Sequence, residues 1–161
     1  MRRIKNGNQQ FGLDPIVFKD SEILILGSLP SRKSIDVGLY FANQGNRFWP
    51  MMARFFDEEV PHSRDEMDSF LKRHHFALWD VYKSAVRKLS SDSSMSDLRY
   101  NDIDHFLNEH PNIKRILVAG KKAQAGFVEH CGNIAFIPVP STSGVNATFN
   151  EAVWYDAIFK Y

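Results

Sequence analysis

A turn with several features of a phosphate-binding loop follows the first apolar run of the chain. In the segment GSLPSRKS (27–34), Gly27 and Lys33 stand nearly where a nucleotide-binding P-loop has its first glycine and its lysine. That pattern requires a second glycine where this chain has Arg32, and Pro30 has no N–H to offer a phosphate. A magnesium-dependent phosphotransferase is therefore one interpretation, and a plain strand followed by a helix-capping serine is the simpler one.

Two more turns of similar chemistry follow later apolar runs. Lys121 and Lys122 come directly after Gly120, and residues 140–147 read PSTSGVNA. Hydroxyl side chains, lysines and exposed N–H groups are common protein partners of phosphate. Asp80 ends the run FALWD as a magnesium-binding strand would, although supporting the fold is its simpler role. The six histidines show no metal-ligand spacing, so we expect neither a metal nor another cofactor.

The apolar pattern predicts alternating strands and helices that position these turns. Short apolar runs typical of buried parallel strands occupy residues 22–28, 76–81, 114–120 and 134–139. Helical spacing and capping side chains predict helices at 47–56, 63–75, 101–109, 121–131 and 149–161. We expect polar loops at 29–46 and 90–96, and an apolar segment packed on the core at 11–18. This order predicts one α/β domain over residues 1–161, with the three turns beyond the carboxyl ends of parallel strands, where ligands bind.

Composition narrows the class of protein further. The chain has 161 residues, 43% of them hydrophobic, which is enough for a sizeable core. Its formal net charge is +1, so any site for a polyanion has to be local. The single cysteine excludes an internal disulfide, and no apolar run approaches the roughly 20 residues of a membrane span. Because the basic start of the chain lacks the apolar stretch of a signal peptide, we expect a cytoplasmic protein.

Taken together, the motifs resemble the uracil-DNA glycosylase superfamily. Within it, the chain is most similar to the hypoxanthine-DNA (deoxyinosine) glycosylases, neighbours of the mismatch-specific uracil glycosylases. The similarity lies in the order of its segments: GSLPS, YFA, NRFW, FALWDVYKSAVR, a strand ending in Gly120, and PSTS followed by NA. The resemblance extends from about Phe11 to about Ala147. It implies a three-layer α/β/α sandwich with a central four-stranded parallel sheet and a pocket for a base flipped out of DNA.

The same resemblance implies a reaction and a catalytic residue. The reaction is hydrolysis of the N-glycosidic bond of a deaminated base, hypoxanthine first and uracil second. Asn46 matches the asparagine that is the best catalytic candidate in deoxyinosine glycosylases, where an amide would orient water and bond the base. Many superfamily members position the water with a polar side chain two residues after Gly27, and here that residue is Leu29. The plainer role for Asn46 is to cap the helix that follows, and the two roles are compatible.

Other matched residues surround the expected base and its flanking phosphates. Phe41 matches the aromatic residue on which the extracted base stacks, although its ring would also suit an ordinary core. The resemblance places further residues near the base: Gly27, Ser28, Leu29 and Gly120. It places another group near the DNA backbone: Ser31, Lys33, Lys121, Ser141, Thr142, Ser143 and Asn146. The plainer alternative for this second group is a solvated or helix-capping loop.

Three departures from the family pattern lie beside the expected pocket. They are Asn43-Gln44-Gly45 in place of histidine and proline, Gly144-Val145 in place of proline and alanine, and Ala119 in place of asparagine. They leave open which of hypoxanthine, uracil, xanthine and mismatched thymine is preferred. We expect a monomer that acts on DNA containing a deaminated base. The alternative is a catalytically weak or inactive nucleic-acid or nucleotide-binding module with the same fold.

Overall fold

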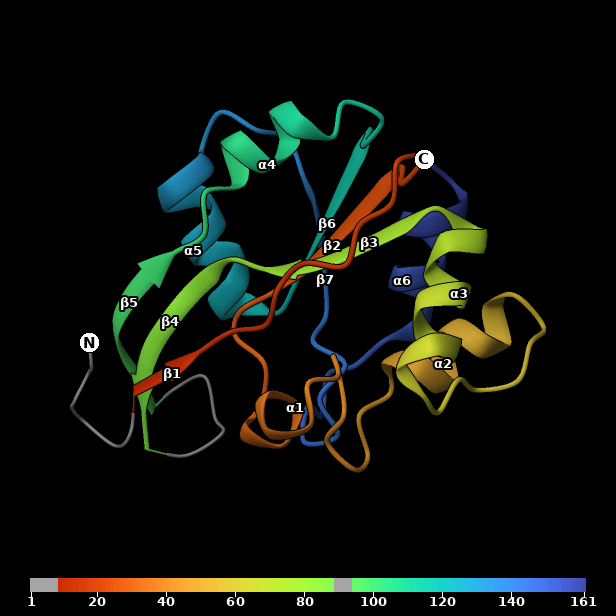
Figure 1. Ribbon diagram of the computed structural model, residues 1–161, viewed down its shortest axis with the longest axis horizontal. Helices are drawn as coiled ribbons and strands as arrows, with labels where there is room; N and C mark the ends of the chain where they lie inside the picture. Colours follow the sequence, from red (N-terminus) through yellow and green to blue (C-terminus); the bar gives the residue numbers. More distant parts are fainter. Residues whose placement is uncertain (1–8, 89–93) are drawn as a thin grey trace.

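A four-stranded parallel sheet forms the centre of the protein (Figure 1). The structure, a computed structural model, describes residues 9–88 and 94–161. The strands lie in the order β3-β2-β6-β7 and are β2 (Ile23–Gly27), β3 (Phe76–Asp80), β6 (Arg115–Ala119) and β7 (Ile137–Val139). The predicted parallel sheet is confirmed, with β7 shorter than the apolar run that predicts it.

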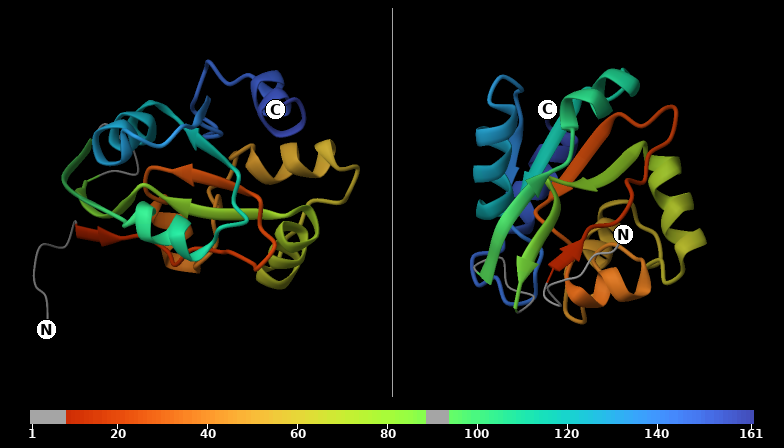
Figure 2. Two further views of the ribbon diagram at one scale, coloured as in Figure 1. Left: turned by 90° about the horizontal axis from the view of Figure 1, so that it is seen from above. Right: turned by 60° about the vertical axis from the view of Figure 1, so that its left-hand side comes forward.

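Helices cover both faces of this sheet, which confirms the predicted three layers (Figure 2). On one face lie α2 (Phe48–Phe55), α3 (Arg64–His74) and α6 (Glu151–Phe159), whose apolar side chains pack with Ile25 and Leu78. On the other lie α4 (Ile103–Glu109) and α5 (Lys121–Cys131), which pack with Leu24 and Leu26. Neighbouring residues of β2 thus enter opposite cores, as expected for a strand buried on both faces. No helix in the described part of the chain is long and apolar enough to cross a lipid bilayer.

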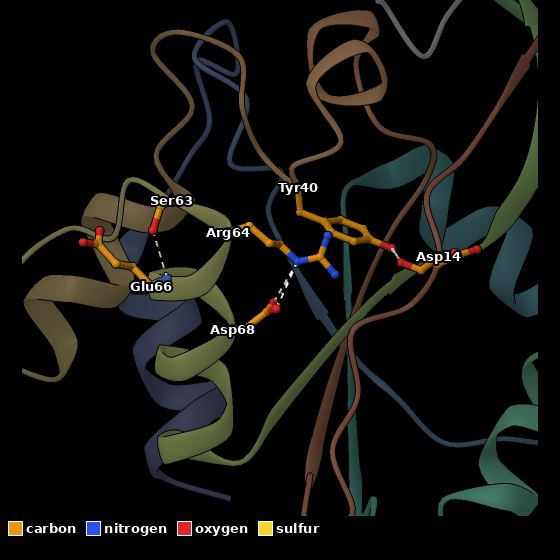
Figure 3. Close-up of polar contacts among 6 residues, drawn as sticks. All are labelled: Asp14, Tyr40, Ser63, Arg64, Glu66 and Asp68. Atoms are coloured by element: carbon orange, nitrogen blue, oxygen red, sulfur yellow. Dashed lines mark hydrogen bonds and ion pairs between the residues drawn. The ribbon is translucent and has the colours of Figure 1, made fainter.

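Capping side chains begin two of the helices at the predicted places. The Ser63 hydroxyl accepts a hydrogen bond from the Glu66 N–H at 3.1 Å at the start of α3 (Figure 3). Asp102 accepts one from the His105 N–H at 3.1 Å at the start of α4. Each cap satisfies an N–H group that has no partner inside its helix.

A second sheet was not predicted from the sequence. It is antiparallel and contains β1 (Gln9–Phe11), β4 (Tyr82–Arg87) and β5 (Met95–Tyr100) in the order β1-β4-β5. The loop expected at 90–96 is therefore wrong at residues 95 and 96, while residues 89–93 lie outside the described part. β4 buries Ser84 and Arg87, so it lacks the alternation of apolar and polar residues that reveals a strand.

The apolar segment expected at 11–18 packs on the core through Leu13, Ile16 and Phe18, while Phe11 at its start is 51% exposed. Ile16 also bridges to Leu78. The loop expected at 29–46 is corrected in part. A short helix, α1 (Arg32–Val37), occupies part of the expected loop. The Ser31 hydroxyl caps it by accepting a hydrogen bond from the Ser34 N–H at 3.1 Å. The segment GSLPSRKS thus has the structure of the simpler interpretation, in which a strand is followed by a serine that caps a helix.

Candidate active site

A cavity of about 540 Å³ lies at the carboxyl ends of the parallel strands, where the fold predicts a ligand site. Figure 1 shows α1 and the segment that precedes α6 at this same end of the molecule. Most of the predicted site residues line the cavity: Gly27, Ser28, Leu29, Ser31, Phe41, Asn46, Ser141, Thr142, Ser143 and Asn146. The topology therefore brings the two motifs together, although more than ninety residues of sequence separate Asn46 from Ser141.

Three predicted site residues do not line the cavity. Lys33 and Lys121 are exposed, on α1 and α5. Gly120 has a positive φ of 88°, and a side chain there would stand 3.3 Å from the Ser141 Cβ. The absence of a side chain at Gly120 therefore permits its close packing on Ser141, and its contact with the base stays a prediction.

The strand ends form the inner part of the cavity. Gly27 of β2 and Asp80 of β3 are paired across the sheet, and a side chain at Gly27 would lie 2.8 Å from the Asp80 Oδ1. The absence of a side chain at Gly27 thus makes room for a carboxylate. Ala119, at the end of β6, lines the same part of the cavity. We call Gly27, Asp80 and Ala119 the floor.

Asp80 was not predicted to belong to the site. It is 5% exposed, and it is the only carboxylate that lines the cavity among the described residues. Burial raises the pKa of Tyr40, and the negative charges of Asp80 and Asp14 raise it further. The sequence signal that could have identified Asp80 is its place at the end of a predicted strand; that it stands level with Gly27 is visible only in the structure. Tyr40 and Ser34 also line the cavity without having been predicted. Asn43 and Val145, from two of the departures expected beside the pocket, line it as well.

Phe41 forms an aromatic wall of the cavity. One face of its ring stacks on Phe48, with 4.1 Å between the ring centroids and 22° between the planes. Its backbone has a φ of 59°, which is unusual for a bulky residue. Both neighbours are anchored, since the Tyr40 hydroxyl donates to the Asp14 carbonyl at 2.8 Å (Figure 3) and the Ala42 N–H donates to the Ser34 hydroxyl at 2.9 Å. The surroundings thus hold a strained backbone that fixes the direction of the ring.

Asn46 lines the cavity together with the residues of the second motif. Its Oδ1 accepts a hydrogen bond from the Phe48 N–H at 2.9 Å, so the capping role considered for it is present at the start of α2. Its amide nitrogen has no hydrogen-bond partner among the described residues. Capping therefore orients the side chain and leaves two N–H groups available to a ligand in the cavity.

The second motif folds into a compact loop. The Asn146 amide donates to the Ser141 carbonyl at 2.8 Å and accepts from the Thr148 N–H and hydroxyl at 3.1 and 2.8 Å. Asn146 thus braces its own loop, and Thr142 is 3% exposed. Ser141 and Ser143 are only half-buried. We call residues 41–46 and 141–146 the rim. Contacts between its residues and DNA remain predictions.

The cavity therefore joins an aromatic surface, a buried carboxylate and an amide, an arrangement that suits a planar, polar ring. Within residues 9–88 and 94–161, no group of three or more His, Cys, Asp or Glu side chains is placed to hold a metal ion.

Comparison with known proteins agrees with this geometry. The family profile "Uracil DNA glycosylase superfamily" matches residues 15–159. The chain therefore belongs to the uracil DNA glycosylase superfamily, which confirms the resemblance seen in its motifs. A hypoxanthine DNA glycosylase of Methanosarcina acetivorans is 33% identical over 156 residues, which cover 93% of this chain and 98% of that protein. One of Methanosarcina barkeri is 33% identical over 114 residues, 70% of this chain and 72% of that protein.

The fold of a relative is also similar. The solution NMR structure of a candidate uracil DNA glycosylase from Methanosarcina acetivorans superposes with a TM-score of 0.79 at 30% sequence identity. The match covers 94% of this chain and 97% of that one. The α/β/α architecture is thus shared over nearly the whole length of both proteins.

Proposed function

We propose that this protein is a monofunctional DNA glycosylase that removes a deaminated base from DNA, hypoxanthine first and uracil second. The observation that carries the proposal is the cavity itself, which Phe41, Asn46 and Asp80 line together. In the reaction, the bond between the sugar C1′ and the base nitrogen breaks and the hydroxyl of water joins C1′. The base leaves with the proton of that water, and DNA retains an abasic site.

Asp80 gives this cavity a chemical reason to prefer deaminated bases. Deamination of adenine to hypoxanthine, or of cytosine to uracil, converts a ring nitrogen from a hydrogen-bond acceptor into an N–H donor. A carboxylate accepts hydrogen bonds and donates none, so Asp80 would bond the altered ring and repel the parent ring. Guanine and its deamination product xanthine both carry an N–H at the corresponding ring nitrogen, so the carboxylate cannot discriminate between these two bases.

The other two residues supply stacking and orientation. The free face of Phe41 would hold the flipped base, as aromatic rings do in proteins that bind unstacked nucleotides. The amide N–H groups of Asn46 would orient water and bond the base. Leu29, which is 6% exposed, offers no polar group to the water. The proposed chemistry therefore depends on early departure of the base and on orientation rather than on a strong general base.

Base release from synthetic oligonucleotides tests this function. The substrates carry inosine, uracil, xanthine or thymine opposite guanine, and EDTA is present because the proposal needs no metal. Alkali-sensitive cleavage at inosine supports the proposal. Cleavage at uracil alone would show that uracil, rather than hypoxanthine, is the preferred base. If a folded protein cleaves none of them, the proposal fails in favour of a nucleic-acid or nucleotide-binding module, the alternative that the apolar side chain of Leu29 keeps open.

The role of Asp80 has its own test in the variant Asp80→Asn. An amide donates as well as accepts, so it can bond the adenine ring as easily as the hypoxanthine ring. We expect release of hypoxanthine to fall roughly 10- to 150-fold, since a hydrogen bond to a charged group contributes about 1.5–3 kcal/mol. The preference for inosine over adenosine should shrink as well. An unchanged preference would remove Asp80 from base recognition. The proposal includes a monomeric, cytoplasmic protein.

A further inference from the structure

Arg47 connects the two loops of the rim. It follows Asn46 directly, and its backbone N–H donates to the Thr142 carbonyl at 2.9 Å. Its guanidinium Nη1 donates to the carbonyls of Ser143 and Asn146, each at 3.1 Å. Its Nη2 reaches the Gly144 carbonyl at 3.5 Å. Arg47 thus bonds the carbonyls of four residues in the second loop: Thr142, Ser143, Gly144 and Asn146.

The guanidinium is held from its other side as well. It lies over the ring of Phe149, with 4.7 Å from its central carbon to the ring centroid, a distance typical of a cation–π contact. The two loops also touch directly beside it, because a side chain at Gly144 would stand 2.8 Å from the Gly45 carbonyl oxygen. Two of the departures from the family pattern, at Gly45 and Gly144, therefore meet in one contact next to Arg47.

This bonding pattern matters for a loop that approaches DNA. Carbonyl oxygens carry partial negative charge and repel phosphate, whereas N–H and hydroxyl groups bind it. The positively charged guanidinium of Arg47 binds the carbonyls of Ser143, Gly144 and Asn146. Its planar, forked donors suit this task, and an ammonium group would not match them. The guanidinium is thus already engaged within the protein.

We propose that Arg47 is a positioning residue that locks the loop 141–146 to the segment that carries Asn46. With the two segments fixed to each other, the loop 141–146 can hold the DNA backbone while the Asn46 amide reaches the base of the same nucleotide. This inference rests on the proposed glycosylase function. The rival role, direct binding of a DNA phosphate by Arg47, gives different results in the experiment below.

The experiment compares Arg47→Lys, which keeps the charge, with Arg47→Met, which keeps the length and loses the donors. Arg73→Lys on α3, an exposed arginine paired with Glu58, is the matched control. For each protein we would measure the single-turnover rate of hypoxanthine release at saturating enzyme. We would also measure affinity for an oligonucleotide with a tetrahydrofuran abasic-site analogue at several salt concentrations.

We expect both Arg47 variants to lose roughly 10²-fold in the single-turnover rate, because small displacements of reacting groups have effects of that size. Affinity should fall as well, while the slope of log Kd against log salt stays as in the wild type. The control should match the wild type in every measurement. A direct phosphate contact predicts a different result: the salt slope of Arg47→Met becomes shallower by about 1, while Arg47→Lys, which keeps the charge, stays close to the wild type. That result would overturn the proposal.

Two further outcomes are decisive. A lower melting temperature with an unchanged rate and affinity, measured well below melting, would reduce Arg47 to a structural role and overturn the proposal. If the wild type releases no base from any oligonucleotide, the glycosylase function itself fails. The positioning role is then judged by affinity alone: weaker binding by both variants at an unchanged salt slope supports it, and unchanged binding overturns it.

Discussion

The floor and the rim of the cavity are held in place by different kinds of interaction. The floor ends strands whose backbones are paired along the sheet, Gly27 with Asp80 and Ala119 with Val139. The rim has no such ladder. Beside backbone bonds such as that from the Arg47 N–H to the Thr142 carbonyl, individual side chains hold its loops, for example the Ser34 hydroxyl that accepts from the Ala42 N–H. Any one of these side-chain bonds can be removed by a single substitution.

This difference separates two properties of the enzyme. The floor is surrounded by buried side chains such as Leu26 and Leu78, both 0% exposed, so its geometry changes only if the core changes. It is suited to decide which base is accepted. The rim carries Asn46, Phe41 and the loop 141–146, so it is suited to hold DNA and align the reaction. Substitutions in the rim should therefore alter the rate while leaving the fold intact.

The largest effect is expected for Asn46 in the rim, where capping and catalysis can be separated. Asn46→Ala removes both the cap of the Phe48 N–H and the amide donors, whereas Asn46→Ser keeps an oxygen that can cap. We expect both variants to lose roughly 10²- to 10³-fold in base release, as for other lost donors at a reacting centre. Only Asn46→Ala should lose about 1 kcal/mol of unfolding free energy. Wild-type activity in Asn46→Ser would leave capping as the sole role of Asn46.

The next largest effect is expected in the floor, for Gly27→Ala. The added methyl group would lie 2.8 Å from the Asp80 Oδ1, so the carboxylate has to turn away. We expect release of hypoxanthine to fall roughly 10²-fold, the usual scale for a small misplacement. Stability should fall by only about 1–3 kcal/mol. A crystal structure of the variant that shows Asp80 unmoved, together with full activity, would contradict the importance of this contact.

A smaller effect is expected for the aromatic wall. Phe41→Ala should weaken binding of DNA with a flipped base by roughly 5- to 150-fold, since stacking contributes about 1–3 kcal/mol per base. Phe41→Gly removes the same ring and also relieves the backbone with its φ of 59°. The two variants should therefore bind DNA equally weakly while Phe41→Gly unfolds at the higher temperature. Fluorescence anisotropy and thermal melts measure the two quantities, and unchanged affinity in both variants would exclude stacking.

The fold was predictable where burial alone determines it. The runs around Leu24, Leu78 and Leu117 are apolar because these strands have cores on both faces, and that pattern is visible in a single sequence. The second sheet was missed because β4 buries Arg87, whose guanidinium donates to the side chain of Gln10 and to the Pro30 carbonyl. A buried polar side chain depends on its partners, and sequence periodicity does not reveal those.

The site was predictable as a place and in part as a set of residues. The alternation of strands and helices indicated a ligand site at the carboxyl ends of the strands, and the motifs supplied Phe41 and Asn46. The cavity position of Asp80 depends on the register of β3 against β2 and on the missing side chain at Gly27. The contacts of Arg47 are to backbone carbonyls, which every residue carries, so no residue type marks them. Tertiary geometry was needed for both.

The smallest effect tests how far the rim extends. Lys33 and Lys121 are exposed outside the cavity, on α1 and α5. If each meets a DNA phosphate, changing it to Gln should weaken binding less than about tenfold and reduce the salt slope by about 1, with the saturated rate of base release unchanged. Lys160→Gln, at the end of α6 and paired with Asp156, is the matched control. An equal change in slope in the control would mean that general charge, rather than an extended rim, attracts the DNA.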